Sequence, residues 1–218
     1  MKKISAFLFT TMICSAVLAA ESPEFSVTTD AIGKDGYVKP EYAYCIADEK
    51  LHSKPAGENK VPGLAWNNYP KNVKSFAVIA VDPDVPTDFS DAGKEGKTIK
   101  STMKRQDFYH WILYNIPASV DSLPEGQRNK YGEGINDYTK FSPDHKERRG
   151  YDGPCPPWND ERVHNYHFRV LALDLQAPLK VSDKITGGDF EKFIQGHIIN
   201  ESEIVGKYSL NPAVSGKP

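Results

Sequence analysis

The stretch that most constrains the fold is an apolar run that leads into two acids between prolines, Phe76 to Pro86. The part from Phe76 to Val81 is rich in β-branched residues, which predicts a strand buried on both faces of a sheet. Because Pro83 has no backbone N–H and a fixed φ, we expect this strand to end at Asp82. An acid at the rim of a sheet is costly to bury, which favours a binding role. The alternative is that Asp82 and Asp84 only cap a turn through their own backbone.

Two later segments also alternate as strands do. The segment Phe108 to Ile116 predicts a second strand, and His164 to Asp174 predicts a third. In the second strand, the period of two predicts one face made of His110, Ile112 and Tyr114. In the third, it predicts one face made of His164, Tyr166, Phe168 and Val170. These strands predict a mainly β protein with polar side chains at the strand ends.

The N-terminus has the pattern of a cleavable secretory signal. Residues 1–20 start with Lys2 and Lys3, continue with an apolar run from Ile4 to Leu18, and end in small residues. We therefore expect a periplasmic or secreted protein in which residues 21–218 form one domain. Because the apolar run is too short for a membrane span, membrane contact is expected to be peripheral at most.

Charge and cysteine content narrow the class of protein further. The chain has 27 Lys and Arg against 29 Asp and Glu, and loss of the signal removes two lysines, which leaves 25 against 29. A mildly acidic chain is not expected to bind nucleic acid. Loss of the signal also removes Cys14 and leaves Cys45 and Cys155 in an oxidising compartment, which predicts one disulfide. The alternative is a pair of buried free thiols.

The remaining segments are mostly loops. Thr87 to Gln106 is polar and lysine-rich, so it is either a solvated loop or a positive lip for an anionic ligand. The proline-rich segment from Gly153 to Pro157 predicts a stiff, extended wall. Asp189 to Ile199 has helical spacing and follows a capping-box start at Thr186, and Glu203 to Tyr208 predicts a last short strand.

The polar groups at the strand ends form a candidate ligand pocket. Converging polar side chains at the mouth of a β core are typical of small-molecule sites. Histidine and tyrosine donors suit phosphate or carboxylate oxygens, whereas Asp82 suits a protonated ligand group or fixes a histidine tautomer. A histidine at a strand end can also be purely structural. The sequence has no glycine-rich phosphate loop and no zinc-type cysteine spacing, so no cofactor is predicted. Histidines that give no comparable signal are His52, His145, His167 and His197.

Four motifs in order carry a resemblance to a known family. They are Asp82-Pro83-Asp84-x-Pro86, Tyr109-His110-Trp111, Gly153-Pro154-x-Pro156-Pro157 and His164-x-Tyr166. Together the motifs resemble the phosphatidylethanolamine-binding protein (PEBP) family, in its bacterial, Raf-kinase-inhibitor-like branch. The resemblance extends from about Tyr42 to Tyr208.

The resemblance implies a fold and a site. The implied fold is a large central antiparallel sheet packed on a smaller sheet, with a C-terminal helix near an anion pocket. The implied pocket residues are Asp82, Pro83, His110, Gly153, Pro154, His164 and Tyr166. The implied activity is binding of phosphate-bearing groups without catalysis, and some relatives inhibit kinases or peptidases, which implies a possible protein partner. Cys45 and Cys155 also fall where many bacterial relatives have cysteines.

Departures from the family pattern leave other functions open. The link from Thr87 to Gln106 is longer than usual, and the loop from Ile46 to Gly57 also looks inserted. One alternative is a metal-assisted hydrolase in which Asp82, His110 and His164 form a facial triad. Another is an interaction module with a vestigial pocket, in which the insertions bind a second exported protein.

Overall fold

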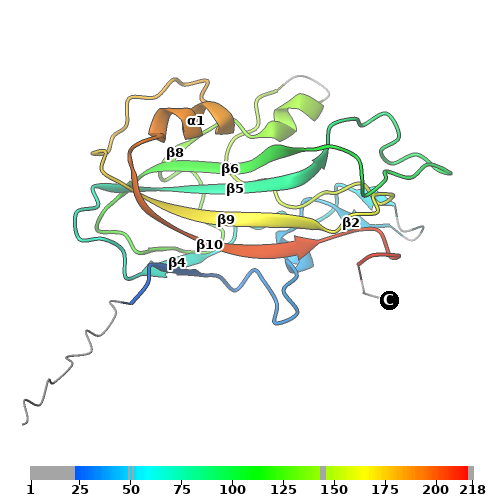
Figure 1. Cartoon of the computed structure of the whole chain (residues 1–218), viewed down its shortest axis with the longest axis horizontal. Coiled ribbons are helices and arrows are strands. Elements are labelled where there is room, and N and C mark those ends of the chain that lie inside the picture. The colour runs from blue at the N-terminus through cyan, green and yellow to red at the C-terminus, as the bar shows by residue number, and fades with distance from the viewer. Residues whose placement is uncertain (1–22, 49, 51, 143–145, 216–218) are drawn as a thin grey trace, which may run out of the picture.

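The computed structural model describes residues 23–48, 50, 52–142 and 146–215, so the predicted signal at residues 1–20 lies outside the described residues. Its largest element is a five-stranded antiparallel sheet with the order β10-β9-β5-β6-β8 (Figure 1). The strands are β5 (Ser75–Pro86), β6 (Arg105–Pro117), β8 (Gly132–Glu133), β9 (His164–Leu173) and β10 (Ile198–Tyr208). The predicted large antiparallel sheet is confirmed.

Smaller elements surround the large sheet. A three-stranded antiparallel sheet contains β1 (Ser26–Thr28), β4 (Leu64–Asn67) and β7 (Ser122–Leu123), in the order β1-β4-β7. A two-stranded ladder contains β2 (Ile46–Ala47) and β3 (Ser53–Lys54). The helical elements are the 3₁₀ turns η1 (Pro40–Tyr42) and η2 (Asp137–Phe141) and the helix α1 (Gly187–Ile194). No helix among the described residues is long and apolar enough to cross a membrane.

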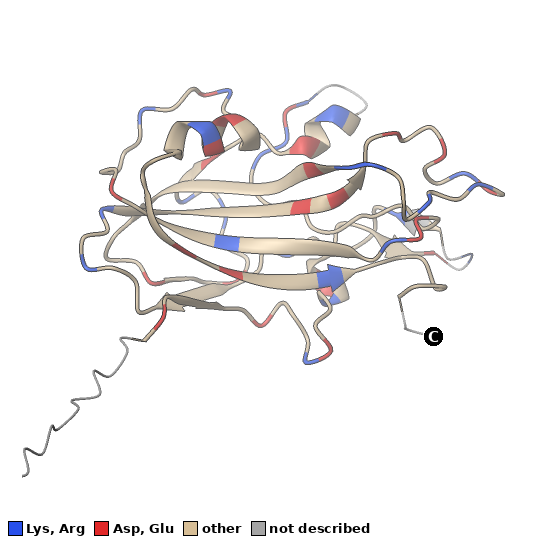
Figure 2. Cartoon of the chain, in the orientation of Figure 1, with Lys and Arg blue, Asp and Glu red and all other residues tan. Residues whose placement is uncertain are grey.

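The large sheet is buried on both faces. On one face Phe76 and Val78 of β5 belong to a core with Trp66 of the three-stranded sheet. On the other face Ile79 belongs to a second core with Phe190 of α1. Figure 2 shows that the charged residues of β5 gather toward the end of that strand. The predicted burial of this strand on both faces is confirmed, and its polar end is the part left for binding.

The prediction that this strand ends at Asp82 is wrong, because β5 continues to Pro86. Pairing with β9 stops at Val81, opposite His167, whereas pairing with β6 resumes at Val85 after an irregularity that follows Asp82. Pro83 therefore lies in a bulge on a strand that has already lost one neighbour. No ladder N–H is needed there, so the proline is tolerated.

The prediction that His110 shares a face with Ile112 and Tyr114 is also wrong. Ala80 pairs with Trp111 and Val81 pairs with Tyr109, so His110 is an extra residue in a β-bulge of β6. Ile112 and Tyr114 face α1, whereas His110 lies on the opposite face. Bulges commonly re-aim a side chain beside a functional site, and this one turns His110 toward the pocket described below.

The C-terminal elements have different bounds from those predicted. Helix α1 is capped by the Thr186 side chain, which accepts a hydrogen bond from the Asp189 N–H, as the capping-box pattern predicted. The helix ends at Ile194, before Gly196 with φ of 84°, and not at Ile199. Strand β10 starts at Ile198 and not at Glu203, because it pairs along almost all of β9. Its polar, exposed middle hides the strand pattern in the sequence.

Candidate functional site

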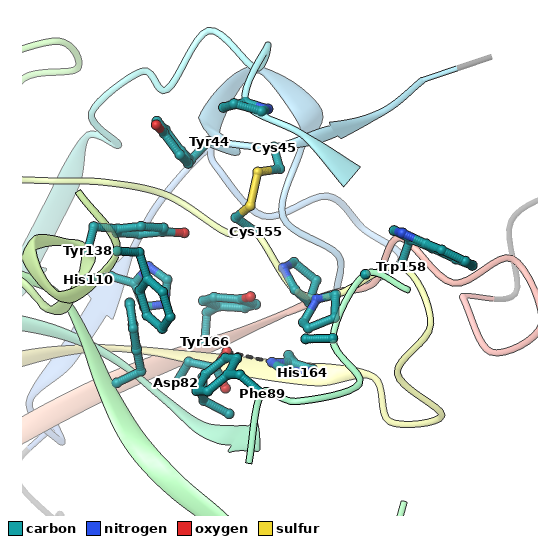
Figure 3. A pocket seen from close by; sticks show the side chains of 18 of the residues that line it. Tyr44, Cys45, Asp82, Phe89, His110, Tyr138, Cys155, Trp158, His164 and Tyr166 are labelled. Carbon is teal, nitrogen blue, oxygen red and sulfur yellow. Dashed lines mark hydrogen bonds and ion pairs between the residues drawn. A yellow bond between two sulfur atoms is a disulfide. The ribbon is translucent and has the colours of Figure 1, made fainter. Parts of the chain in front are cut away.

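A cavity of about 600 Å³ lies where the ends of β5, β6 and β9 meet the surrounding loops. In an antiparallel sheet the C-terminal end of one strand adjoins the N-terminal ends of its neighbours, so these three strands bring their polar ends together. The predicted residues that line the cavity are Asp82, His110, His164 and Tyr166. Figure 3 shows Tyr166 between His110 on one side and His164 on the other.

His164 lies between two carboxylates. Its Nδ1 is 2.7 Å from Asp82 Oδ2, and its Nε2 is 3.2 Å from Asp160 Oδ2. Burial alone would lower the pKa of His164, but the charges of Asp82 and Asp160 outweigh burial and raise the pKa to about 9. The ring is therefore an imidazolium at neutral pH, and both of its N–H groups donate to the protein. This corrects the expectation that His164 donates to a ligand.

The charge network continues beyond His164 to Arg105. Asp160 receives two hydrogen bonds from this guanidinium, at 2.5 Å from Nη1 and 2.9 Å from Nη2. The side chains of Arg105 and Asp160 are 6% and 1% exposed. Two carboxylates and two cations thus alternate in the series Asp82, His164, Asp160 and Arg105. Such a buried network is costly to interrupt, because removal of one member leaves a partner charge uncompensated.

Asp82 has a local contact as well as its bond to His164. Its Oδ1 accepts a hydrogen bond of 2.8 Å from the backbone N–H of Asp84. One oxygen of Asp82 therefore caps the turn, as the turn-capping interpretation predicts, and the other holds His164. Asp84 does not line the cavity, and it accepts hydrogen bonds from Asn165 and Arg162.

His110 differs from His164 in having an open acceptor. Its Nδ1 lies 2.7 Å from the backbone carbonyl oxygen of Asp152, so Nδ1 carries the hydrogen. Burial lowers the pKa of His110, which leaves the ring neutral at neutral pH with a lone pair on Nε2. That Nε2 is buried and has no hydrogen-bond partner within the described part of the chain. A buried unpaired acceptor costs about 1–3 kcal/mol, so a donor supplied by a ligand would be favourable.

Two tyrosine hydroxyls of the cavity, those of Tyr138 and Tyr166, are engaged by the protein. Burial raises the pKa of Tyr166 well above its usual value, and the charge of Asp82 and a hydrogen bond to it raise it further. Burial likewise raises the pKa of Tyr138, whose hydroxyl donates to the carbonyl of Gly153 at 2.7 Å. Both phenols stay protonated, and both have partners.

Arg148 is the only Lys or Arg among the described residues that line the cavity. Two of its nitrogens donate to Asp152, Nε at 2.9 Å and Nη2 at 2.6 Å. Its guanidinium also lies over the rings of Tyr44 and Tyr138, at 4.8 and 5.7 Å from the centroids. The third nitrogen, Nη1, has only a contact of 3.5 Å with the Tyr44 hydroxyl. Arg148 is thus fixed in place with donor capacity to spare for an anion.

The proline-rich segment forms a wall only in part. Cys155, Pro156 and Pro157 line the cavity, whereas Pro83, Gly153 and Pro154 do not. A Cβ on Gly153 would lie 1.9 Å from the carbonyl oxygen of Tyr42, so this glycine permits a close approach of two backbones. The carbonyl of Pro154 accepts the N–H groups of Tyr44 and Cys45. These residues position the wall from behind it.

The predicted disulfide between Cys45 and Cys155 is confirmed. It joins residues 110 positions apart in the sequence, and both cysteines line the cavity. Figure 3 shows the bond beside the pocket. It therefore ties the segment after η1 to the proline-rich wall.

Several lining residues were not predicted from the sequence. His52 gives no signal in the sequence, yet it lines the cavity and its ring centroid lies 4.6 Å from that of Trp158. Arg148 and Tyr138 lie in a long connection without strand or helix periodicity, so no pattern marked them. Asp160 was not predicted either; it does not line the cavity but contacts His164, which follows it by four residues in the sequence.

The lysine-rich segment does not behave as a positive lip. Arg105 is buried against Asp160, Lys100 pairs with Glu161 at 2.7 Å, and Lys97 lies 3.7 Å from Asp91. None of the lysines from Thr87 to Gln106 lines the cavity. Figure 2 shows both signs of charge along the loop. What the segment contributes to the cavity is Phe89, Ala92 and Gly93.

The metal triad proposed for Asp82, His110 and His164 is not supported by the geometry. The described residues contain no group of three or more His, Cys, Asp or Glu side chains that could hold a metal ion. Both nitrogens of His164 face carboxylates, and Nδ1 of His110 faces a carbonyl. These three ring nitrogens therefore carry hydrogens that they donate to oxygen atoms, and they are not directed at a common metal ion.

A mainly β fold with a partly polar cavity at its strand ends has the form of a small-ligand-binding protein. Residues 28–209 match the family model described as phosphatidylethanolamine-binding protein, and the chain belongs to this family. The resemblance seen in the four sequence motifs is thereby confirmed.

Individual relatives agree with the family assignment. The UPF0098 protein YbcL of Escherichia coli is 28% identical over 213 residues, which cover 92% of this chain and 98% of YbcL. The UPF0098 protein PH1269 of Pyrococcus horikoshii is 35% identical over 156 residues, which cover 67% of this chain and 63% of that protein. The crystal structure of E. coli YbcL, described as a new member of the mammalian PEBP family, has a TM-score of 0.64 and 26% identity. The structural match covers 86% of this chain and 99% of the YbcL chain.

Proposed function

We propose that this protein is an exported binding protein whose pocket holds a small phosphate-bearing group that brings a proton with it. The observation that carries the proposal is the buried Nε2 of His110, which has no hydrogen-bond partner in the described part of the chain. Because this atom is an acceptor, a bare anion would not be held there. A phosphomonoester in its monoanionic form offers both a P–OH donor for His110 and an anionic oxygen for Arg148.

The same proton can be described in two ways. Either the ligand's P–OH donates to neutral His110, or a phosphate dianion accepts from a protonated His110. Both descriptions place one proton between Nε2 and a phosphate oxygen, so binding takes up a proton wherever the free phosphate is a dianion. Asp82 adds negative charge to this end of the pocket, which further disfavours a fully ionised ligand.

Export and modulation of a partner protein belong to the same proposal. The signal pattern at residues 1–20 supports export to the periplasm or outside the cell, and the family relationship supports a binding role without catalysis. We infer that any inhibition of a kinase- or peptidase-class partner proceeds by recognition at the pocket. N-terminal sequencing of protein recovered from the periplasm tests export. The expected mature chain starts at residue 20 or 21, and an intact Met1 would contradict this.

Calorimetric titration with inorganic phosphate and with O-phosphoethanolamine tests the pocket. We expect wild type to bind both, and we expect His110→Ala to lose at least about tenfold in affinity through loss of one charge-assisted hydrogen bond. The matched control is His197→Ala, because His197 is 45% exposed, pairs with Asp174 and lies outside the pocket. Absence of binding by the wild-type protein would remove the phosphate proposal.

A further inference from the structure

A continuous aromatic wall leads from His110 to the protein surface. The ring of Phe108 lies 5.0 Å from that of His110 and 6.0 Å from that of Phe141, measured between centroids. Phe89 then meets Phe141 edge to face at 5.0 Å. Phe108, Phe141 and Phe89 all line the cavity, and they come from β6, η2 and the loop after β5. Three separate segments therefore present phenylalanine rings to one space.

This wall is more exposed than an ordinary core. Phe141 is 51% exposed, and the only other large apolar side chains of the described residues with comparable exposure are Phe193 and Val205, which do not line the cavity. A cluster of rings at a cavity mouth is costly in water unless something apolar covers it. The cavity is also lined by Trp158, whose ring packs against that of His52. Figure 3 shows Trp158 on the side of the pocket away from Tyr138.

The cavity is much larger than a phosphate group needs. Its volume of about 600 Å³ falls in the range of sites that hold drug-sized molecules, roughly 300–1,000 Å³. A single phosphate at His110 would leave the space along the aromatic wall to water. The ligand therefore needs an apolar body beyond its phosphate.

We propose that the ligand is a phosphomonoester of an aromatic ring, with the phosphate at His110 and Arg148 and the ring against Phe89, Phe108 and Phe141. This inference rests on the proposed function, because it names the ligand class of the same pocket. An aromatic body is favoured over a flexible chain because the wall offers ring faces and edges, to which another ring adds offset or edge-to-face contacts. A rigid ring also loses less conformational freedom on binding than an alkyl chain.

The wall depends on a segment in which this chain departs from the family pattern. Phe89 belongs to the long link from Thr87 to Gln106, and His52 on the Trp158 side belongs to the loop from Ile46 to Gly57. The lengthened link thus supplies a ring, and not a positive charge, to the cavity. We infer that these segments set the ligand specificity of this chain.

Calorimetry with inorganic phosphate, phenyl phosphate and hexyl phosphate tests the inference. We expect phenyl phosphate to bind at least about tenfold more tightly than inorganic phosphate, as burial of one aromatic ring allows, and more tightly than hexyl phosphate. Phe141→Ala and Phe89→Ala should each weaken phenyl phosphate binding several-fold, while inorganic phosphate binding stays unchanged. Phe193→Ala is the matched control, because this exposed phenylalanine lies on α1 outside the cavity.

Phe141→Leu guards against a loss of folding in the alanine variants. It keeps most of the apolar volume and removes one of the three rings, so it should reduce the preference for phenyl over hexyl phosphate without changing the melting temperature. Wild-type protein that binds phosphate, but binds phenyl phosphate no tighter than inorganic or hexyl phosphate, overturns the aromatic ligand and leaves the phosphate pocket intact. Wild-type protein that binds none of the three removes the phosphate pocket itself.

Discussion

The two histidines of the pocket lie at the same end of the large sheet, His110 on β6 and His164 on β9, but they differ in their hydrogen-bond partners. His164 is 1% exposed, and both of its nitrogens donate to carboxylates that the protein supplies. His110 is 3% exposed, but only one of its nitrogens has a partner among the residues that the structure describes. The closed histidine belongs to a charge network that stabilises the strand ends. The open histidine keeps one acceptor for a ligand, so the same residue type serves stability on one side and binding on the other.

The charge network around the closed histidine, His164, should lose stability when one of its charges is removed. Asp160→Ala leaves Arg105 without its bidentate partner and His164 without one of its two carboxylates, so we expect a loss of about 3–5 kcal/mol in the free energy of unfolding. Urea denaturation measures this loss. The neighbouring Glu161→Ala is the matched control. It removes the exposed pair with Lys100, worth about 0–1 kcal/mol, and the hydrogen bond from the Ser101 N–H, worth about 0.5–1.5 kcal/mol. Similar losses in the two variants would show that the buried network is not special.

The free energy of unfolding should depend on pH in opposite ways through the two histidines. The pKa of His164 is raised from 6.5 to about 9, so its contribution is complete below pH 6.5 and is lost as the pH rises through about 9, on the order of 3 kcal/mol. The pKa of His110 is lowered, so its contribution is complete above pH 6.5 and is lost as the pH falls below it.

Unfolding curves across this pH range separate the two contributions. His164→Gln should flatten the alkaline limb of the stability profile, and His110→Gln should flatten the acid limb. The assignment of the two charge states would be reversed if each variant flattened the other limb.

Ligand affinity should depend on pH through the open histidine. Because one proton lies between Nε2 and the phosphate, the affinity for O-phosphoethanolamine should fall about tenfold per pH unit above the second phosphate pKa of about 6. Titration at several pH values in buffers of different ionisation heat gives both the affinity and the proton uptake. An affinity that stays constant or rises over this range would contradict a shared proton.

The smallest expected effect concerns Arg148. Arg148→Lys keeps a positive charge but loses the bidentate contact with Asp152 and the stacking on Tyr44 and Tyr138. We expect phosphate affinity to fall only a few-fold, because the charge remains near the pocket. Calorimetry compares this variant with Arg149→Lys, whose parent side chain does not line the cavity. Equal affinities for the two variants would remove Arg148 from the binding contacts.

The sequence predicted the strands and the convergence of their polar ends, which carry Asp82, His110, His164 and Tyr166, but not the face of the sheet on which His110 lies. Local apolar runs and alternation mark the strands, and polar residues mark their ends, so the convergence follows from antiparallel pairing. The disulfide was predicted from the two cysteines that lie outside the expected signal at residues 1–20. These features depend on short stretches of sequence or on simple counting.

The states of the two histidines were not predictable in the same way. The bulge that turns His110 toward the pocket depends on the register between β5 and β6, which no local pattern in β6 records. The charge of His164 depends on Asp160, which Arg105 holds from 55 positions away in the sequence. The aromatic wall likewise assembles from segments that are distant in sequence and lack periodicity.

Nitrogen NMR of the histidine rings, with O-phosphoethanolamine added at neutral pH, tests the central claim most directly. In the free protein, we predict that both nitrogens of His164 are protonated and that Nε2 of His110 is not. On addition of the ligand, the Nε2 signal of His110 should move toward the protonated range, while the signals of His164 stay in place. A change at His164 with an unmoved His110 Nε2 would contradict the division between a closed and an open histidine.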